Sequence, residues 1–178
     1  MSAPDREERF RRLFLAEYRH VLAYSLRRTS DLADAQDVVA DTFTVAWRRI
    51  EDAPEDDDAR SWLFAIARRA FANQRRSGQR RSALRDRLRL QPPVSAGASE
   101  ATEQRQQLQT VLDAFARLSR DEQEVLRLAL WEDLSHRELG IVLGCTENAA
   151  AIRLHRARRR LLEESMKDEP SAGHSLET

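Results

Sequence analysis

The segment that decides the fold is residues 118–162, LSRDEQEVLRLALWEDLSHRELGIVLGCTENAAAIRLHRARRRLL. Two Ser-x-x-Glu patterns, at Ser119 and Ser135, each precede an apolar run, which is the spacing of a capping box at a helix start. Gly144 then supplies the residue that most easily adopts a left-handed conformation after a helix, and Thr146 can cap the next one. The segment predicts a helix-turn-helix, whose second helix usually enters the major groove of DNA.

The last helix of this segment is strongly basic. Residues 151–160 contain no acid and five arginines, Arg153, Arg156, Arg158, Arg159 and Arg160. Such a helix gains from phosphate contacts whatever the base sequence. The alternative is an ordinary solvated face of a bundle helix. The capped turn directly in front favours DNA binding.

Composition excludes several classes of protein. The 178 residues carry 30 basic and 30 acidic side chains, and the single cysteine, Cys145, excludes an internal disulfide. The four histidines have no partners at ligand or triad spacing, and no glycine-rich phosphate loop is present. We therefore expect no enzyme, no cofactor and no metal. The N-terminus lacks the apolar core of a signal peptide and no segment is a membrane span, so the expected location is cytoplasmic.

All periodic segments indicate helices, and the predicted fold is all-α. A first helix is expected over about residues 7–28, and a second follows a cap at Ser30 or Asp31. The acidic segment 51–58, which contains six acids, predicts a loop. A third helix is expected from near Ser61 to the glycine-interrupted stretch after Arg76. The aromatic residues of these three helices are expected mainly in the shared core of the bundle. They are Phe14, Tyr18, Phe43, Trp47, Trp62 and Phe71.

A stretch rich in proline and small residues, 90–102, predicts a flexible linker between two small helical domains. Helix is expected to resume near Glu103, with apolar side chains facing inward at Leu108, Val111, Leu112 and Phe115. The predicted organisation is an N-terminal helical domain, a linker, a helix-turn-helix domain and a disordered polar tail, at residues 7–80, 81–106, 107–165 and 166–178.

The order of these segments resembles a known family. DLADAQDVVADTFTVAWRRI (31–50) and ARSWLFAIARRAFANQRR (59–76) resemble region two of bacterial sigma factors, in particular the extracytoplasmic-function (ECF) group of the sigma-70 family. Residues 118–161 resemble region four. The resemblance covers about 10–162, nearly all of the chain. It implies an alternative sigma factor that binds core RNA polymerase, recognises two promoter elements and promotes initiation.

The resemblance also implies which residues contact the polymerase. The helix that matches the one docking on the clamp of the largest subunit carries Asp34, Asp37, Asp41, Thr42, Phe43 and Trp47. An acidic ridge beside an apolar stripe suits a basic partner helix, although solvated helix charge is the ordinary alternative. The loop 51–60 matches the specificity loop that captures a flipped base of the minus-ten element. No aromatic residue lies within it, so the capturing side chain stays open.

The third helix matches the element that opens the strands and reads the minus-ten sequence. Its expected DNA-contacting residues are Arg60, Trp62, Arg68, Arg69, Asn73, Arg75 and Arg76. The arginines could hold phosphates, Asn73 has the paired donor and acceptor that suit adenine, and Trp62 could stack on a base. Core packing is the alternative for Trp62. The linker is expected to thread through the polymerase toward the RNA exit path, with a simple tether as the competing view.

For the minus-thirty-five element, the matching residues are Thr146, Glu147, Asn148, Arg153, His155, Arg156 and Arg158. The chain departs from the common family pattern at 149–152, where three alanines and Ile152 stand in the first turns. Short apolar side chains touch thymine methyl groups but cannot hydrogen-bond to base edges. Base reading therefore falls to Glu147, Asn148, Arg153 and Arg156, while the arginines chiefly position the helix on phosphates.

Other partners and functions follow from the same resemblance. The family contacts the flap of the polymerase as well as the clamp, and it is commonly held inactive by an anti-sigma factor. Two alternatives stay open: a stand-alone helix-turn-helix regulator whose N-terminal bundle senses a ligand or dimerises, and an enzyme with an appended helix-turn-helix. The acidic helix and the arginine-rich third helix argue against the first, and the lack of a catalytic constellation argues against the second.

Overall fold

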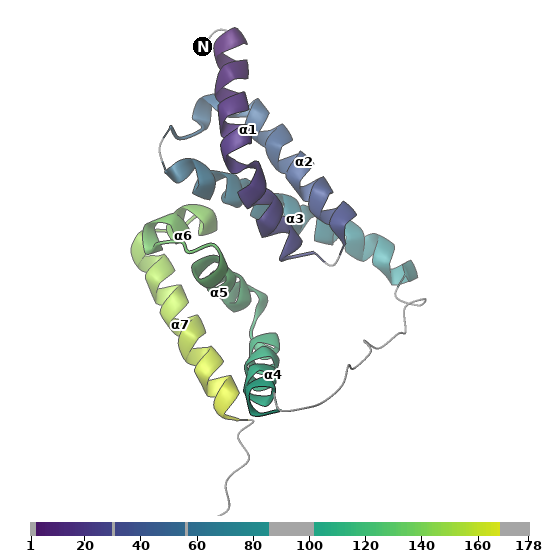
Figure 1. Cartoon of the computed structure of the whole chain (residues 1–178), viewed down its shortest axis with the longest axis vertical. Coiled ribbons are helices and arrows are strands. Elements are labelled where there is room, and N and C mark those ends of the chain that lie inside the picture. The colour runs from purple at the N-terminus through teal and green to yellow at the C-terminus, as the bar shows by residue number, and fades with distance from the viewer. Residues whose placement is uncertain (1–2, 30, 56, 86–101, 168–178) are drawn as a thin grey trace, which may run out of the picture. The chain divides into compact units, whose positions relative to one another are not determined.

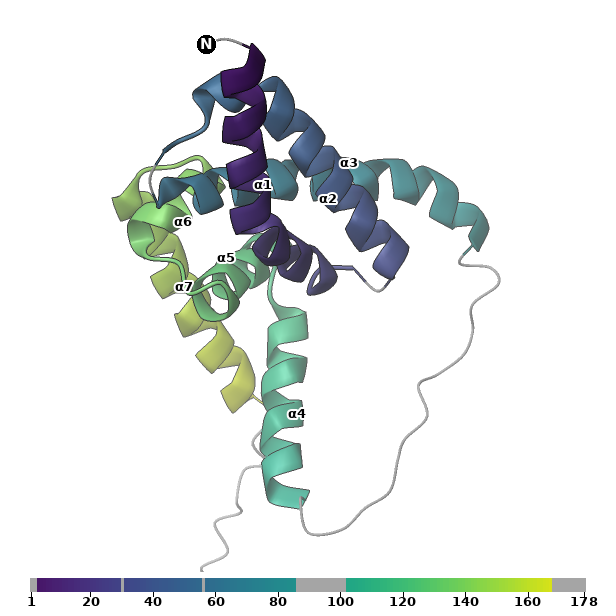
Figure 2. The ribbon, with the colours of Figure 1, turned by 45° about the horizontal axis from the view of Figure 1, so that its top comes forward.

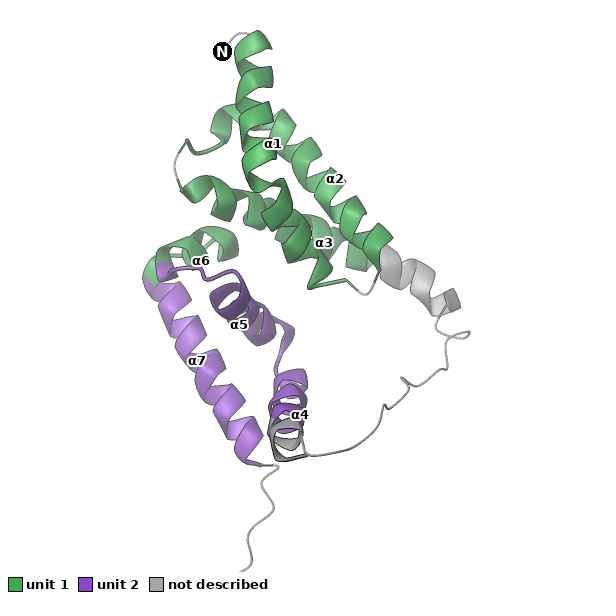
Figure 3. Cartoon of the chain, viewed as in Figure 1, with its two compact units in different colours: residues 1–92, 137–147 green, residues 93–136, 148–178 purple. Residues whose placement is uncertain are grey.

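The computed structural model describes residues 3–29, 31–55, 57–85 and 102–167, and side chains within them except at 77–85 and 102–107. Every regular element in these ranges is helical, so the all-α prediction is confirmed for the described chain (Figure 1). Most of the predicted linker and tail lies outside the described residues. The chain divides into two compact units (Figure 3), residues 1–92 with 137–147, and residues 93–136 with 148–178.

The first unit is built on three long helices, in which α1 and α2 run side by side and α3 crosses them (Figures 1 and 2). Its elements are α1 (Ala3–Leu26), α2 (Leu32–Arg48), the 3-10 turn η1 (Ile50–Asp52), α3 (Asp58–Arg85) and most of α6 (His136–Leu143). Aromatic rings join the helices: Phe14 packs edge-on against Phe43 at 4.7 Å, and Tyr24 stacks on Phe64 at 4.9 Å between ring centroids. Tyr24, Phe43 and Phe64 are buried, so these rings form the centre of the core.

Two helix starts in this unit bear on the predictions. Asp31 caps α2, because its side chain accepts a hydrogen bond from the amide of Ala33 at 3.1 Å. This confirms one of the two expected caps, and Ser30 lies outside the described residues. Helix α3 begins at Asp58, earlier than the expected start near Ser61, with an acid in its first turn where it favours the helix dipole.

Helix α3 also continues past Gly78 to Arg85, beyond the expected end. A single interior glycine costs only about 1 kcal/mol relative to alanine, which is too little to end a helix by itself.

The second unit contains α4 (Thr102–Arg117), α5 (Arg120–Trp131) and α7 (Glu147–Met166), of which all but the first residue of α7 belong to it. The capping box predicted at Ser119 is confirmed. The hydroxyl of Ser119 accepts from the amide of Glu122 at 3.3 Å, and the carboxylate of Glu122 accepts from the amide of Ser119 at 2.8 Å. The buried core of this unit includes Ala114, Leu118, Val125, Leu126, Leu128, Leu154 and Ala157.

The inward orientation expected for the apolar stripe of α4 is wrong for Leu108, Val111 and Leu112, whereas Phe115 is half-buried. Leu108, Val111 and Leu112 are 59%, 45% and 51% exposed, while Ala114 and Leu118 face the core. The stripe has helical spacing, but the part of the chain that the structure describes does not cover these three side chains. The exposed face is therefore available to a partner.

A buried carboxylate joins α4 to the end of α7. The side chain of Glu164 is only 5% exposed and accepts hydrogen bonds from Arg117 at 3.2 Å and Lys167 at 2.7 Å. Arg160 adds an ion pair at 2.9 Å. The hydrogen bond from Lys167 chiefly lowers the pKa of Glu164, with charge attraction from Lys167 and Arg160 in the same direction and burial opposing them. The carboxylate thus stays ionised and ties the two helices together.

We predict that Glu164→Gln destabilises the protein at neutral pH and that the difference fades in acid. Because the folded pKa of Glu164 is depressed, its contribution is present above the unfolded pKa and is lost as pH falls through the folded value. Urea unfolding of both proteins, from pH 7 downward in steps, measures this. Glu163→Gln, at an adjacent and half-exposed carboxylate, should show a much smaller change. Equal effects of the two substitutions would contradict the assignment.

Candidate nucleic-acid and partner-binding surfaces

Helix α2 separates an acidic face from a buried face. Asp34, Asp37 and Asp41 are exposed along one side. The opposite side packs into the core through residues such as Ala35, Val38, Val39 and Ala46. Thr42 and Phe43 belong to that buried side: Thr42 is fully buried, and its hydroxyl donates to the carbonyl of Val38 at 2.6 Å. These two residues therefore hold the acidic face in place from beneath.

Trp47 lies at the margin of this surface. Its ring is 38% exposed and packs edge-on against Phe10 at 5.3 Å, with the guanidinium of Arg6 over it at 5.5 Å. Trp47 is thus partly core and partly surface. An accessible aromatic edge beside an acidic ridge offers a partner both apolar and charged contacts.

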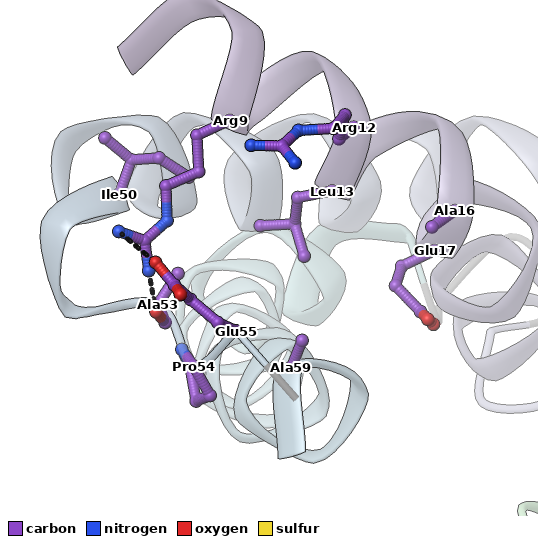
Figure 4. Close-up of a pocket in the computed structure, with 10 residues that line it drawn as sticks. All are labelled: Arg9, Arg12, Leu13, Ala16, Glu17, Ile50, Ala53, Pro54, Glu55 and Ala59. Atoms are coloured by element: carbon purple, nitrogen blue, oxygen red, sulfur yellow. Dashed lines mark hydrogen bonds and ion pairs between the residues drawn. The ribbon is translucent and has the colours of Figure 1, made fainter. Parts of the chain in front are cut away.

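The acidic loop is held against α1 by long-range contacts of two arginines: Arg9 was not among the predicted site residues, and Arg60 was predicted to contact minus-ten DNA. Arg9 donates to the backbone carbonyl of Ala53 and forms an ion pair with Glu55 at 3.5 Å (Figure 4). Nearby, Arg60 at the start of α3 pairs with Glu17 at 2.9 Å. The partners are about forty residues apart in sequence, so no local pattern signals them.

A pocket of about 380 Å³ opens between α1 and this loop (Figure 4). Its lining combines apolar side chains with two arginines and two glutamates, and consists of Arg9, Arg12, Leu13, Ala16, Glu17, Ile50, Ala53, Pro54, Glu55 and Ala59. The volume lies within the usual range for small-molecule sites.

Helix α3 presents part of its expected DNA surface directly to solvent. Arg69, Asn73 and Arg76 are exposed at the i, i+4, i+7 spacing of one helix face. Arg76 donates to the side-chain carbonyl of Asn73 at 2.6 Å, which orients the amide. Arg68, Arg75 and Trp62 are half-buried. Trp62 is two turns before Arg69 on the same face, whereas Arg68 and Arg75 are each one residue before Arg69 and Arg76 and so lie to the side of it.

The turn between α6 and α7 depends on two glycines. Gly144 has φ of 66°, the left-handed conformation predicted for the residue after the helix. The amide of Cys145 donates to the carbonyl of Gly140 at 2.9 Å, which closes the turn. A Cβ atom on Gly140 would lie 2.8 Å from the carbonyl oxygen of Cys145. The close approach of these two backbones therefore requires glycine at position 140.

Helix α7 buries one side and exposes the arginine-rich remainder. Ala150, Leu154 and Ala157 are buried. All the residues that were matched to the minus-thirty-five element are exposed. They are Thr146, Glu147, Asn148, Arg153, His155, Arg156 and Arg158. A surface of this charge is suited to the phosphates that flank a major groove.

Within the described residues, no group of three or more His, Cys, Asp or Glu side chains is arranged to hold a metal ion. None of the described helices is long and apolar enough to cross a membrane.

Comparison with known proteins supplies the class. Residues 13–81 match the family model for sigma-70 region 2, and residues 108–161 match the model for sigma-70 region 4. The chain is 32% identical over 139 residues to the ECF RNA polymerase sigma factor SigL of Mycobacterium tuberculosis, with 78% of each protein covered.

Two solved structures are also similar. The sigma factor RpoE from Bartonella quintana, in complex with the anti-sigma factor NepR, has a TM-score of 0.61 and 25% identity, over 90% of this chain and 98% of that one. CnrH, in complex with the cytosolic domain of CnrY, has a TM-score of 0.56 and 25% identity, over 89% and 88%. The chain belongs to the ECF RNA polymerase sigma factors of the sigma-70 family. It is an alternative sigma factor, a DNA-binding factor for transcription initiation.

We predict that Gly140→Ala destabilises the protein by about 1–3 kcal/mol, because the new methyl group forces backbone apart in a packed turn. Alanine ordinarily stabilises a helix interior, so the sign is diagnostic. Gly144→Ala is the comparison: it meets no neighbour within 4 Å but is strained by its positive φ, and it should cost about 1 kcal/mol. Denaturant midpoints measure both, and a stabilising Gly140→Ala contradicts the close approach.

Proposed function

We propose that the exposed faces described above divide the work of this sigma factor among polymerase, promoter and inhibitor. The observation that carries the proposal is that one chain exposes both an acidic helix, α2, and an arginine-rich helix, α7. A sigma factor has to bind a protein and DNA at once, and surfaces of opposite charge suit these two tasks. The functional borders we propose are a region 2 domain (7–80), a linker (81–106), a region 4 domain (107–165) and a tail (166–178).

Core polymerase binds chiefly at the acidic face of α2. Asp34, Asp37 and Asp41 contact a basic helix of the clamp, and the exposed edge of Trp47 adds apolar contact. Thr42 and Phe43 act from the core by fixing the orientation of α2. Gln74 of α3 supports the same helix, since its amide donates to the carbonyl of Asp34 at 3.2 Å.

The minus-ten element is opened and read by the loop 51–60 and by α3. The exposed face of Arg69, Asn73 and Arg76 contacts the separated strand, with Arg68 and Arg75 on its phosphates and Trp62 beside it. Arg60, paired with Glu17, holds the loop to α1. A flipped base enters the pocket beside the loop, whose lining combines apolar side chains with hydrogen-bonding groups.

The minus-thirty-five element is bound by α7. Arg153, His155, Arg156 and Arg158 supply affinity through phosphates, and Glu147 and Asn148 reach base edges from the first turn after Thr146. The exposed stripe of Leu108, Val111 and Leu112 on α4 is the docking surface for the polymerase flap.

An anti-sigma factor competes for the same exposed apolar and acidic surfaces. The similar sigma factor from Bartonella quintana is solved in complex with an anti-sigma factor, which supports the binding of such a partner. The chain catalyses nothing itself and works in the cytoplasm beside the polymerase, which supplies the chemistry.

We expect the isolated protein to bind promoter duplex weakly and to gain specificity only with core polymerase, because region 2 must engage strands that the polymerase helps to separate. Fluorescence anisotropy at physiological salt, with and without core enzyme, measures this. Tight sequence-specific binding by the protein alone favours the alternative of a stand-alone helix-turn-helix regulator.

Charge reversal on α2 tests the docking face. Asp37→Arg with Asp41→Arg should weaken association with core polymerase by roughly tenfold or more, since like charges brought together at an interface cost several kcal/mol. Asp34 is left intact because its carboxylate also accepts a hydrogen bond from Gln74, at 3.4 Å, which the substitution would remove. The matched control reverses the exposed pair Glu7 and Glu8 on α1. Native circular dichroism shows that both variants fold, and equal polymerase binding by both rejects the face.

A further inference from the structure

The four apolar residues at the start of α7 are not equivalent in the folded protein. Ala150 is fully buried, and Ala149 and Ala151 are half-buried. Ile152 is 44% exposed, although it is the largest of the four and the most costly to leave in water. In the sequence the four residues form one apolar run, but in the folded protein only Ile152 is exposed.

Ile152 lies at the centre of the exposed face of α7. Asn148 is one turn before it and Arg159 two turns after it, at i−4 and i+7, and both are exposed. Arg153 and Arg156 lie beside this line on one side, and His155 lies on the other. The side opposite, with Ala150, Leu154 and Ala157, is buried. An isolated aliphatic side chain is thus surrounded by groups suited to DNA.

The floor of the major groove has one apolar group that such a side chain can match. Thymine presents a 5-methyl group there, whereas the other edge positions are hydrogen-bond donors and acceptors. The first turns of a recognition helix are the part that reaches base edges. Ile152 cannot hydrogen-bond, so its contribution to DNA binding has to be contact with apolar surface.

We propose that Ile152 packs against the 5-methyl group of one thymine in the minus-thirty-five element and so makes that position selective for thymine. This rests on the proposed binding of that element by α7. Asn148, one turn earlier, reads a neighbouring base pair through its amide. The arginines around them give affinity without distinguishing bases.

The test uses holoenzyme made from core RNA polymerase and the full chain. Promoter duplexes with a randomised minus-thirty-five element are selected for binding, and each thymine of the selected sequence is replaced singly by deoxyuracil, which removes only the methyl group. At one thymine the replacement should weaken binding by roughly fourfold, the value of about one buried methylene-sized group. With Ile152→Ala, the same replacement should change binding little or not at all.

Two controls separate the contact from a general defect. Ile152→Val keeps a branched side chain and should keep most of the sensitivity to deoxyuracil. Leu162→Ala removes another exposed aliphatic residue of α7, 60% exposed and nearly three turns away, and should keep all of it. Thermal unfolding should be little changed in each, because these positions are exposed.

The outcomes distinguish this inference from the proposed function. The thymine contact alone is overturned if the holoenzyme selects a defined element in which no thymine is sensitive to replacement by deoxyuracil. It is also overturned if a thymine remains sensitive in Ile152→Ala. Failure of the holoenzyme to select any minus-thirty-five sequence overturns the proposed binding by α7 and this inference with it.

Discussion

The helical surfaces of this protein depend on one constraint: an amphipathic helix buries one stripe of its circumference and exposes the rest. In α2 the buried stripe runs through Val38, Thr42 and Ala46. Once these residues face the core, the helical repeat places Asp37 and Asp41 on the outside. The core therefore determines the surface that a partner meets. A substitution that rotated α2 would misplace the acidic ridge even if every aspartate were kept.

Long-range polar contacts position the segments that have no buried stripe or that lie at helix ends. The loop after η1 has no stripe of its own, and it is positioned by Arg9 at the carbonyl of Ala53 and by the pair of Arg60 with Glu17. Glu164 does the same for the ends of α4 and α7. The ion pairs of the loop are partly exposed and stabilise the fold only modestly, so their main effect is on geometry, whereas the buried Glu164 also contributes to stability.

The sequence was sufficient where the determining interaction is local. The capping box of Ser119 with Glu122 and the left-handed Gly144 follow from neighbours in the chain, and both are confirmed. The outward face of α4 was mispredicted because periodicity cannot tell whether Leu108 or Leu112 is covered by the same chain or by another. The anchoring of the loop by Arg9 was not predictable either, since its partner lies 44 residues away. The roles proposed for single site residues stay predictions.

Helix α7 shows the same difference between what the spacing of apolar residues indicates and which of them the fold buries. Read as sequence, its first turns look poor for DNA recognition, because an apolar run replaces hydrogen-bonding side chains. In the folded helix, Ala150 completes the core and its neighbours sit at the margin, which leaves Asn148 and Ile152 outside. The run therefore serves two purposes with one set of residues. Small side chains let the helix pack closely on one side, and a single large one is left to discriminate bases on the other.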